Sequence, residues 1–271
     1  MHLSELVRMA LQEDVGGGDV TTEATIPTSH SSTAKITAKQ GLVVFGHEIA
    51  SEVFAQMGCV YTPQVEEGTF LEKGTIVAVV EGPTGKMLTA ERLALNFLMR
   101  LCGIATHTYN TVEGLNPSMK VVDTRKTTPL LRRLERSAVC AGGGFNHRFA
   151  LYDGILIKDN HISACGSIAK AIAAAKSHAH HLMKIEIEVE SLKGLQEAIE
   201  AGADVVMLDN MTDDQYREAV NIANGRVMLE ASGNMNRERL LRIQNIGIDV
   251  VSMGGLIHQA TWADLSMKMS S

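Results

Sequence analysis

From residue 119 onward, short apolar runs alternate with longer amphipathic segments. Strand-like apolar runs cover 119–122, 155–157, 183–189, 205–208, 227–229 and 248–251. Helical spacing of apolar residues covers 130–141, 167–181, 192–201, 213–223 and 237–246. This alternation predicts an α/β region of parallel strands joined by crossover helices. Six repeats without room for two dinucleotide-binding halves favour a closed or nearly closed (β/α) barrel over an open sheet.

The chain before residue 103 follows a different pattern. Apolar positions at helical spacing predict helices over 4–12, 48–56 and 88–102. Alternating and β-branched residues predict strands within 33–45, and glycine turns divide short strands within 67–82. The mixture predicts an α+β region that differs from the repeats after it.

Composition restricts the classes of protein to consider. The 271 residues are 45% hydrophobic and 21% charged, which suits one large or two smaller soluble domains. The formal net charge is -6, and no basic tail or stripe suggests nucleic-acid binding. No apolar run is long enough for a membrane span, and the N-terminus does not resemble a signal peptide. The 4 cysteines are scattered without metal-ligand spacing, so we expect a reducing, cytoplasmic location.

The strand ends carry most of the candidate chemistry, because the loops that follow them converge at one mouth in a (β/α) barrel. In chain order the ends are first basic, then acidic, then small and glycine-rich: Arg125, Lys126, Lys158, Glu186, Glu188, Glu190, Asp209, Asn210, Glu230, Ser232, Gly233, Ser252, Gly254 and Gly255. Glycines expose backbone N–H groups and predict a phosphate cradle. The cations predict a local site for a strongly anionic ligand in an otherwise acidic protein.

Alternation within residues 185–190 places Glu186, Glu188 and Glu190 on one face of a strand. Inside a barrel such carboxylates need partners, so we favour a functional role for this face, with Glu188 as the first choice. Asp209, taken alone, could equally be a helix cap or a ligand.

Three long motifs resemble those of one enzyme family. They are Asp123-Thr124-Arg125-Lys126-Thr127-Thr128-Pro129, Gly142-Gly143-Gly144-Phe145-Asn146-His147-Arg148, and Asp153-Gly154-Ile155-Leu156-Ile157-Lys158-Asp159-Asn160-His161. In this order they closely resemble quinolinate phosphoribosyltransferase, the decarboxylating nicotinate-nucleotide pyrophosphorylase. The resemblance extends from Asp14 to Lys268.

The resemblance implies transfer of phosphoribose from phosphoribosyl pyrophosphate (PRPP) to quinolinate, with release of pyrophosphate and CO2, in NAD biosynthesis. It implies an N-terminal α+β sandwich domain over 1–103, with the tail 262–271 packed back on it, and an incomplete, type II phosphoribosyltransferase-like (β/α) barrel over 104–261. It also implies Mg2+ as cofactor and a homodimer with shared active sites, in which Arg92 enters the partner's substrate site.

Roles for individual residues follow from the motif matches. The expected catalytic residues are Lys126, Lys158, Glu188 and Asp209, of which Glu188 and Asp209 are also the expected metal ligands. The expected substrate-binding residues are Arg92, Arg125, Lys126, His147, Arg148, Lys158, Glu188, Asp209, Ser232, Gly233, Asn234, Ser252, Gly254 and Gly255.

Three alternatives remain open on the sequence. The molybdenum-transport-associated relative of the family has a different anionic acceptor, but its pattern generally lacks the full Asn-His-Arg wording found at 146–148. A Schiff-base aldolase would use Lys126 or Lys158. A non-catalytic protein would bind the same anions without turnover. Leu130, Asn234 and Met253 depart from the family's usual residues and weaken the details of the phosphate loop.

Overall fold

The computed structural model describes residues 2–270, which form two compact units. The first unit extends to Asn110 and also contains Thr128–Gly143 and the chain from Ala260 onward. The second unit contains Thr111–Thr127 and Gly144–Gln259. None of the helices in the described chain is long and apolar enough to cross a membrane.

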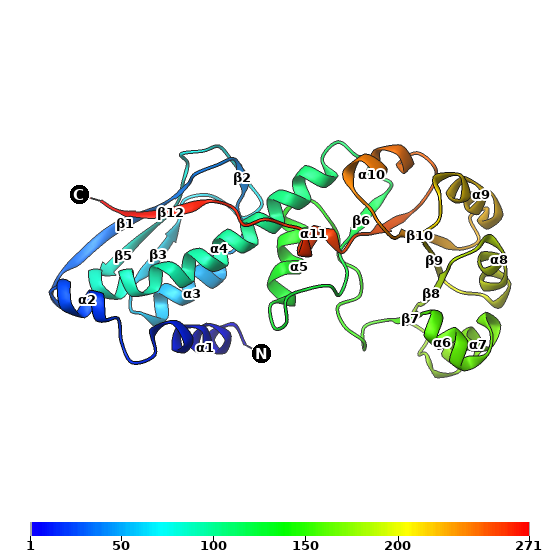
Figure 1. Cartoon of the computed structure of the whole chain (residues 1–271), viewed down its shortest axis with the longest axis horizontal. Coiled ribbons are helices and arrows are strands. Elements are labelled where there is room, and N and C mark those ends of the chain that lie inside the picture. The colour runs from blue at the N-terminus through cyan, green and yellow to red at the C-terminus, as the bar shows by residue number, and fades with distance from the viewer. Residues whose placement is uncertain (1, 271) are drawn as a thin grey trace. The chain divides into compact units, whose positions relative to one another are not determined.

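The first unit is built on a four-stranded antiparallel sheet with the order β12-β1-β5-β3 (Figure 1). The chain order of its elements is α1 (Leu3–Val15), α2 (Val20–Thr25), β1 (Ser31–Ala38), β2 (Leu42–Val43), α3 (His47–Gln56), β3 (Val60–Pro63), β4 (Phe70–Leu71), β5 (Ile76–Pro83), α4 (Thr84–Val112), α5 (Arg132–Ala141) and β12 (Leu265–Met269). On β1, Ala34, Ile36 and Ala38 are buried while Lys35 is exposed, as period-2 alternation requires. The helix α3 packs on β3, and α1 packs on α3.

The C-terminal tail forms β12, which runs antiparallel to β1 from Leu265 opposite Ala38 to Met269 opposite Ala34. The helix α4 runs unbroken across residue 103, so the domain boundary predicted there falls within a helix and stays a prediction. The helix predicted at 130–141 begins at Arg132, and its contacts place it in the first unit rather than among the crossover helices of the second.

The second unit contains a six-stranded parallel sheet with the order β6-β11-β10-β9-β8-β7. Its strands are β6 (Lys120–Val122), β7 (Ile155–Ile157), β8 (Ile185–Val189), β9 (Val205–Asp209), β10 (Met228–Ser232) and β11 (Val250–Ser252). Its helices are α6 (Asp159–Cys165), α7 (Ile168–His178), α8 (Leu192–Ala201), α9 (Asp213–Ala223), α10 (Arg237–Ile243) and α11 (Gly255–His258). The prediction of an α/β region with parallel strands is confirmed.

Consecutive strands β6 and β7 lie at opposite edges of this sheet, as expected for an incomplete barrel. The connection between them passes beside β6 before it reaches β7. There the Phe145 N–H donates to the Val121 carbonyl, and the Asp123 N–H donates to the Phe145 carbonyl. This parallel bridge fixes the backbone immediately before His147 and Arg148 next to the end of β6.

Polar side chains start the crossover helices, just beyond a strand end for α8, α9 and α10 and directly after α6 for α7. Ser167, Ser191, Thr212 and Asn236 each accept a hydrogen bond from a backbone N–H in the first turn of α7, α8, α9 and α10. Such caps satisfy N–H groups that have no partner within the helix. They therefore limit the loops that carry the candidate site residues to a few positions each.

Candidate active site at the carboxyl ends of the parallel strands

A cavity of about 580 Å³ lies at the carboxyl ends of the strands in the second unit. Residues predicted for the site line it from six loops: Lys126, Lys158, Glu188, Asp209, Ser232, Gly233, Asn234, Ser252, Gly254 and Gly255. Their convergence follows from the fold, since the carboxyl ends of parallel strands meet at one face. The cavity is also lined by Asn210, another of the predicted strand-end residues, and by Thr124, His258 and Gln259, to which the sequence assigns no role.

An adjoining cavity of about 370 Å³ contains the rest of the predicted cations of this unit. It is lined by Arg125, His147 and Arg148, and it shares Lys126 and Lys158 with the first cavity. Apolar side chains, Leu156 and Met207, complete its walls. Two guanidinium groups, two ammonium groups and apolar walls form a site suited to a flat ligand with more than one carboxylate.

The acidic residues of the larger cavity already have partners within the protein. The Lys158 ammonium forms an ion pair with Glu188 from the neighbouring strand β8. Asp209, at the end of β9, accepts a hydrogen bond of 2.6 Å from the side chain of Asn210. Neighbouring side chains therefore hold both carboxylates of the cavity in place.

Glycines allow two loops to approach closely in this cavity. Gly233 has φ +95°, and a Cβ there would lie 2.2 Å from Asn210 Oδ1. A Cβ on Gly254 would lie 2.9 Å from Lys126 Cδ. Arg239 links the Gly233 loop to the loop after β9, because it donates to the carbonyls of Gly233 and Met211. The result is a backbone-lined recess of the kind that binds phosphate groups.

His147 lies at the inner end of the cationic cavity beside two buried glutamates. Its Nε2 is 3.2 Å from a carboxylate oxygen of Glu186 and 3.5 Å from one of Glu230. Its backbone N–H donates to Asp123, and its Nδ1 accepts from the Arg148 N–H at 2.7 Å. Glu186 and Glu230 come from β8 and β10, which flank β9, so the curved sheet brings their side chains together.

Burial and the neighbouring carboxylates shift the pKa of His147 in opposite directions. Burial lowers the pKa of His147, but hydrogen bonds and charges from Glu186 and Glu230 outweigh it and raise the pKa to about 10. Burial, assisted by the charge of Glu230, raises the pKa of Glu186. Because the Arg148 N–H points at Nδ1, a ring proton shared with the two carboxylates fits on Nε2.

Burial and the nearby charge of Arg125 lower the pKa of Arg148. Its Nη1 donates to the Gly154 carbonyl at 2.7 Å, which directs the guanidinium along the wall of the cationic cavity. Two arginines this close repel each other, and an anionic ligand between them would relieve that repulsion.

Comparison with known proteins decides the family. The model of the quinolinate phosphoribosyl transferase N-terminal domain matches residues 19–102, and the model of its C-terminal domain matches residues 104–268. The chain belongs to the quinolinate phosphoribosyltransferase family. The motifs at 123–129, 142–148 and 153–161 thus identified the family correctly.

Relatives match over the full length of the chain. A probable nicotinate-nucleotide pyrophosphorylase [carboxylating] of Bacillus subtilis is 41% identical over 273 residues, covering 100% of this chain and 94% of the relative. The crystal structure of NadC from Streptococcus pyogenes has a TM-score of 0.95 and 40% identity, covering 99% of this chain and 97% of that one. The nicotinate-nucleotide pyrophosphorylase from Francisella tularensis has a TM-score of 0.94 and 36% identity, covering 99% of this chain and 96% of that one.

Of the predicted catalytic and substrate-binding residues, Arg92 alone lines neither cavity. Arg92 is exposed on α4 in the first unit, and its predicted role in a partner's site stays a prediction. Glu190 lies beyond the end of β8 and is exposed, so only Glu186 and Glu188 of the three aligned glutamates point into the barrel. The strand predicted over 183–189 ends at Val189 as expected, which leaves Glu190 outside it.

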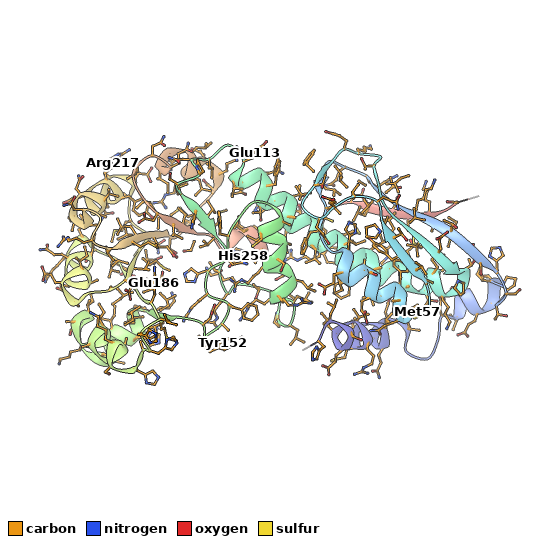
Figure 2. The ribbon with its side chains drawn as sticks, turned by 180° about the vertical axis from the view of Figure 1, so that it is seen from behind. Met57, Glu113, Tyr152, Glu186, Arg217 and His258 are labelled. Atoms are coloured by element: carbon orange, nitrogen blue, oxygen red, sulfur yellow. The ribbon has the colours of Figure 1, made fainter. Side chains whose placement is uncertain are left out.

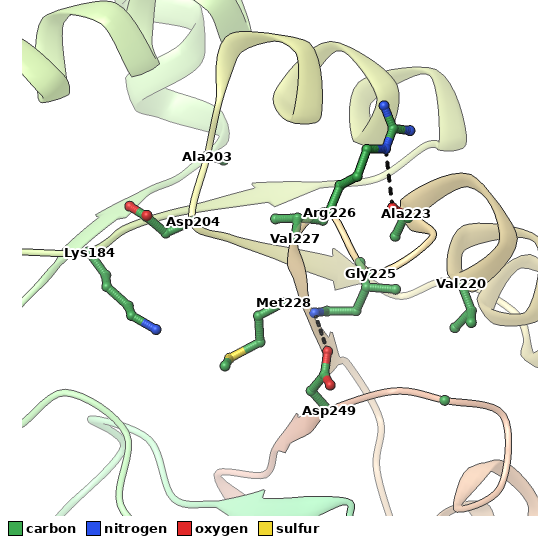
Figure 3. A pocket seen from close by; sticks show the side chains of 12 residues that line it. Lys184, Ala203, Asp204, Val220, Ala223, Gly225, Arg226, Val227, Met228 and Asp249 are labelled. Atoms are coloured by element: carbon green, nitrogen blue, oxygen red, sulfur yellow. Dashed lines mark hydrogen bonds between the residues drawn. The ribbon is translucent and has the colours of Figure 1, made fainter.

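A further hollow lies at the opposite ends of the strands (Figure 3). Its charged side chains serve the fold: Asp204 and Asp249 accept from the Ile185 and Leu229 N–H groups, and Arg226 donates to the carbonyl of Ala223. In barrels of this kind, that face contributes to stability rather than to chemistry. We therefore assign the active site of this family member to the carboxyl ends.

Proposed function

We propose that the protein catalyses transfer of phosphoribose from PRPP to quinolinate, giving nicotinate mononucleotide, pyrophosphate and CO2 in NAD biosynthesis. The observation that supports this most strongly is the pairing of two cavities that share Lys126 and Lys158. One is lined by arginines and apolar side chains, and the other by glycine-rich loops and carboxylates. Family membership supports the same reaction, because the relatives carry the name of this activity.

Quinolinate would occupy the cationic cavity. It is a flat ring with two adjacent carboxylates, which Arg125 and Arg148 would hold, with Lys126 and Lys158 on the side that faces PRPP. Leu156 and Met207 would contact the ring. This placement directs the ring nitrogen toward the larger cavity, where the ribose would lie.

PRPP would occupy the larger cavity. The backbone around Gly233 and Gly254 would bind phosphate oxygens, while Asp209 and Glu188 would face the ribose. As pyrophosphate departs, the sugar gains oxocarbenium character, and these two carboxylates would stabilise the positive charge. Once the ring nitrogen is ribosylated and positive, it stabilises the electron pair that remains on the neighbouring carbon when CO2 leaves. A proton taken up from solvent at that carbon then gives nicotinate mononucleotide.

The cavity also suits Mg2+, because its carboxylate oxygens are the ligands this ion prefers. Asp209 is the better of the two predicted protein ligands, since Glu188 is already paired with Lys158. When bound together with PRPP, Mg2+ would offset charge on the leaving pyrophosphate.

We also propose a cytoplasmic homodimer in which Arg92 of one subunit completes the site of the other. The exposed position of Arg92 on α4 supports this arrangement. Mixing the inactive variants Arg92→Ala and Arg125→Ala tests it, because each mixed dimer would contain one site with both arginines. Random exchange of subunits would restore about a quarter of wild-type activity. No recovery after confirmed subunit exchange would show that Arg92 does not act across the dimer.

The activity is tested by incubating the protein with quinolinate, PRPP and Mg2+ and measuring nicotinate mononucleotide and CO2 together. We expect equal amounts of both products, and neither when nicotinate replaces quinolinate. Arg125→Ala should abolish turnover, whereas the matched control Arg217→Ala, on the exposed face of α9, should not.

Two outcomes would refute the proposal. PRPP binding without products would indicate a different anionic acceptor. Borohydride trapping of a carbonyl substrate on Lys126 or Lys158 would indicate Schiff-base chemistry instead.

A further inference from the structure

We propose that Glu186 and Glu230 are positioning residues that fix the imidazole of His147, and through it the main chain at Arg148, at the inner wall of the quinolinate cavity. The inference rests on the proposed function, because it concerns the same cavity. Neither glutamate lines the cationic cavity itself, so each would act through His147.

Both carboxylates are buried and directed at the imidazole, and Glu186 also interacts with the charge of Arg148. Glu186 is 8% exposed and Glu230 is 3% exposed, and each directs one oxygen at His147 Nε2. Glu186, labelled in Figure 2, belongs to the same strand as Glu188 but lies one inward-facing position deeper in the barrel. Burying two carboxylates is costly, so their retention beside one imidazole needs a reason.

His147 also lines a second cavity of about 430 Å³, which extends toward the amino ends of the strands. Apolar residues such as Val205 and Met228 line it together with polar and charged ones, Glu186 and Glu230 among them. His147 and Arg148 are the cationic-cavity residues that also line this second cavity. The side chain is 14% exposed and borders both cavities, and hydrogen bonds at both ring nitrogens fix its orientation.

The hydrogen bonds form a directional chain. Glu186 and Glu230 accept at Nε2, which places the ring proton there and leaves a lone pair on Nδ1. That lone pair accepts the Arg148 N–H, and the Arg148 side chain then reaches the Gly154 carbonyl. Without the glutamates, the ring could adopt the other tautomer, whose Nδ1–H would face the Arg148 N–H. The carboxylates therefore orient a substrate-binding arginine without touching substrate.

The same geometry excludes the other function that these residues suggest. His147, Glu186 and Glu230 offer three ligand atoms within 4.8 Å of one another, which could hold a metal ion. A metal would need the lone pair of Nε2, and then Nδ1 would carry the proton. The Arg148 N–H already occupies that position, so a proton-bearing Nε2 fits and a metal-bound one does not.

The test uses Glu230→Leu, which removes the acceptor at similar volume, and Glu230→Gln, which keeps an acceptor oxygen. Loss of a hydrogen bond to a charged group predicts a rise of about tenfold in the KM for quinolinate in E230L. We expect the KM for PRPP to stay within about twofold, and E230Q to recover most of the loss. Glu190→Leu, at the exposed end of the same face, is the matched control and should change neither constant.

A double-mutant cycle with His147→Ala decides whether the glutamate acts through the histidine. If it does, E230L adds almost nothing in the H147A background. Full additivity, or equal rises in both KM values, would overturn the inference. If E230L shows no cooperative thermal transition, the isosteric double variant E186Q/E230Q takes its place in the test. The inference then predicts that this variant raises the KM for quinolinate but not the KM for PRPP.

Direct titration of quinolinate separates this inference from the proposed function. A wild-type protein that binds no quinolinate would refute the proposed function. A wild-type protein that binds quinolinate, with E230L and E186Q/E230Q binding equally well, would refute only the positioning role.

Discussion

Glu135 is a fully buried carboxylate of the first unit that no sequence pattern predicts, and its removal has a predictable cost. The side chain lies in the first turn of α5 and is 0% exposed. It accepts four hydrogen bonds, from Arg100 Nε and Nη2 and from the backbone N–H and hydroxyl of Thr128. Arg100 also donates to the Ala260 carbonyl, so the cluster joins three separate stretches of the chain.

Glu135→Ala leaves a guanidinium that is only 16% exposed without its carboxylate. Breaking a buried ion pair in this way costs about 3–5 kcal/mol. For a chain of this size that corresponds to a fall of roughly 10 °C in the midpoint of thermal unfolding. Differential scanning calorimetry and urea unfolding would measure the change, with midpoints compared directly because the chain has two units.

The ion pair between Glu48 and Arg133 provides the control. It is also in the first unit, but its atoms are 3.7 Å apart and its side chains are 65% and 57% exposed. Glu48→Ala should therefore change stability by no more than about 0.5 kcal/mol. If Glu135→Ala destabilised the protein no more than Glu48→Ala, burial and hydrogen bonding would not be the source of the cluster's contribution.

Three further predictions concern single positions. Gly233→Ala forces a Cβ against Asn210 at φ +95°, so kcat/KM for PRPP should fall at least about tenfold, measured by steady-state kinetics with quinolinate saturating. Leu130→Gly should raise the unfolding midpoint by about 1–2 °C, because an exposed leucine at φ +67° is strained, and an unchanged or lower midpoint would contradict this. Burial raises the pKa of Asp213, but hydrogen bonds from Arg242 and Arg239 outweigh it and lower the pKa below 3.8. The contribution of Asp213 to folding stability is therefore present above its unfolded-state pKa and is lost as pH falls through the lower folded-state pKa. We expect the difference in the free energy of unfolding between wild type and Asp213→Asn to be constant from pH 5 to 8. The difference should disappear in acid, at about pH 4 and below.

Much of the second unit could be predicted because its signals are local. Six apolar runs correspond to β6 to β11, and strand and helix periods are properties of neighbouring residues, so a sequence shows them directly. The rule that barrel chemistry gathers at carboxyl ends correctly groups Lys126, Lys158, Glu188 and Asp209, which line one cavity. The family motifs then supplied the substrates, which no periodicity could.

The contacts that sequence did not predict depend on the curvature of the sheet. Glu186 and Glu230 lie on β8 and β10, with β9 between them, and flat strands would keep their side chains apart. That both reach the same nitrogen of His147 follows from barrel curvature, which alternation does not encode. His258 lies at the end of the short helix α11, where its position depends on how that helix leaves β11.

Leu130, Asn234 and Met253 depart from the family's usual residues, but the structure accommodates each of them with little change to the site. Asn234 has φ +49°, and asparagine is among the few residues other than glycine that enter this region at low cost. Met253 is buried, and its N–H donates to the Val122 carbonyl, a bond that any residue except proline could make. Of the three, Leu130 takes up a strained backbone, and it lines neither cavity. The backbone of the glycine-lined recess thus accommodates these residues, and none of the three is one of the charged residues predicted to bind the substrates.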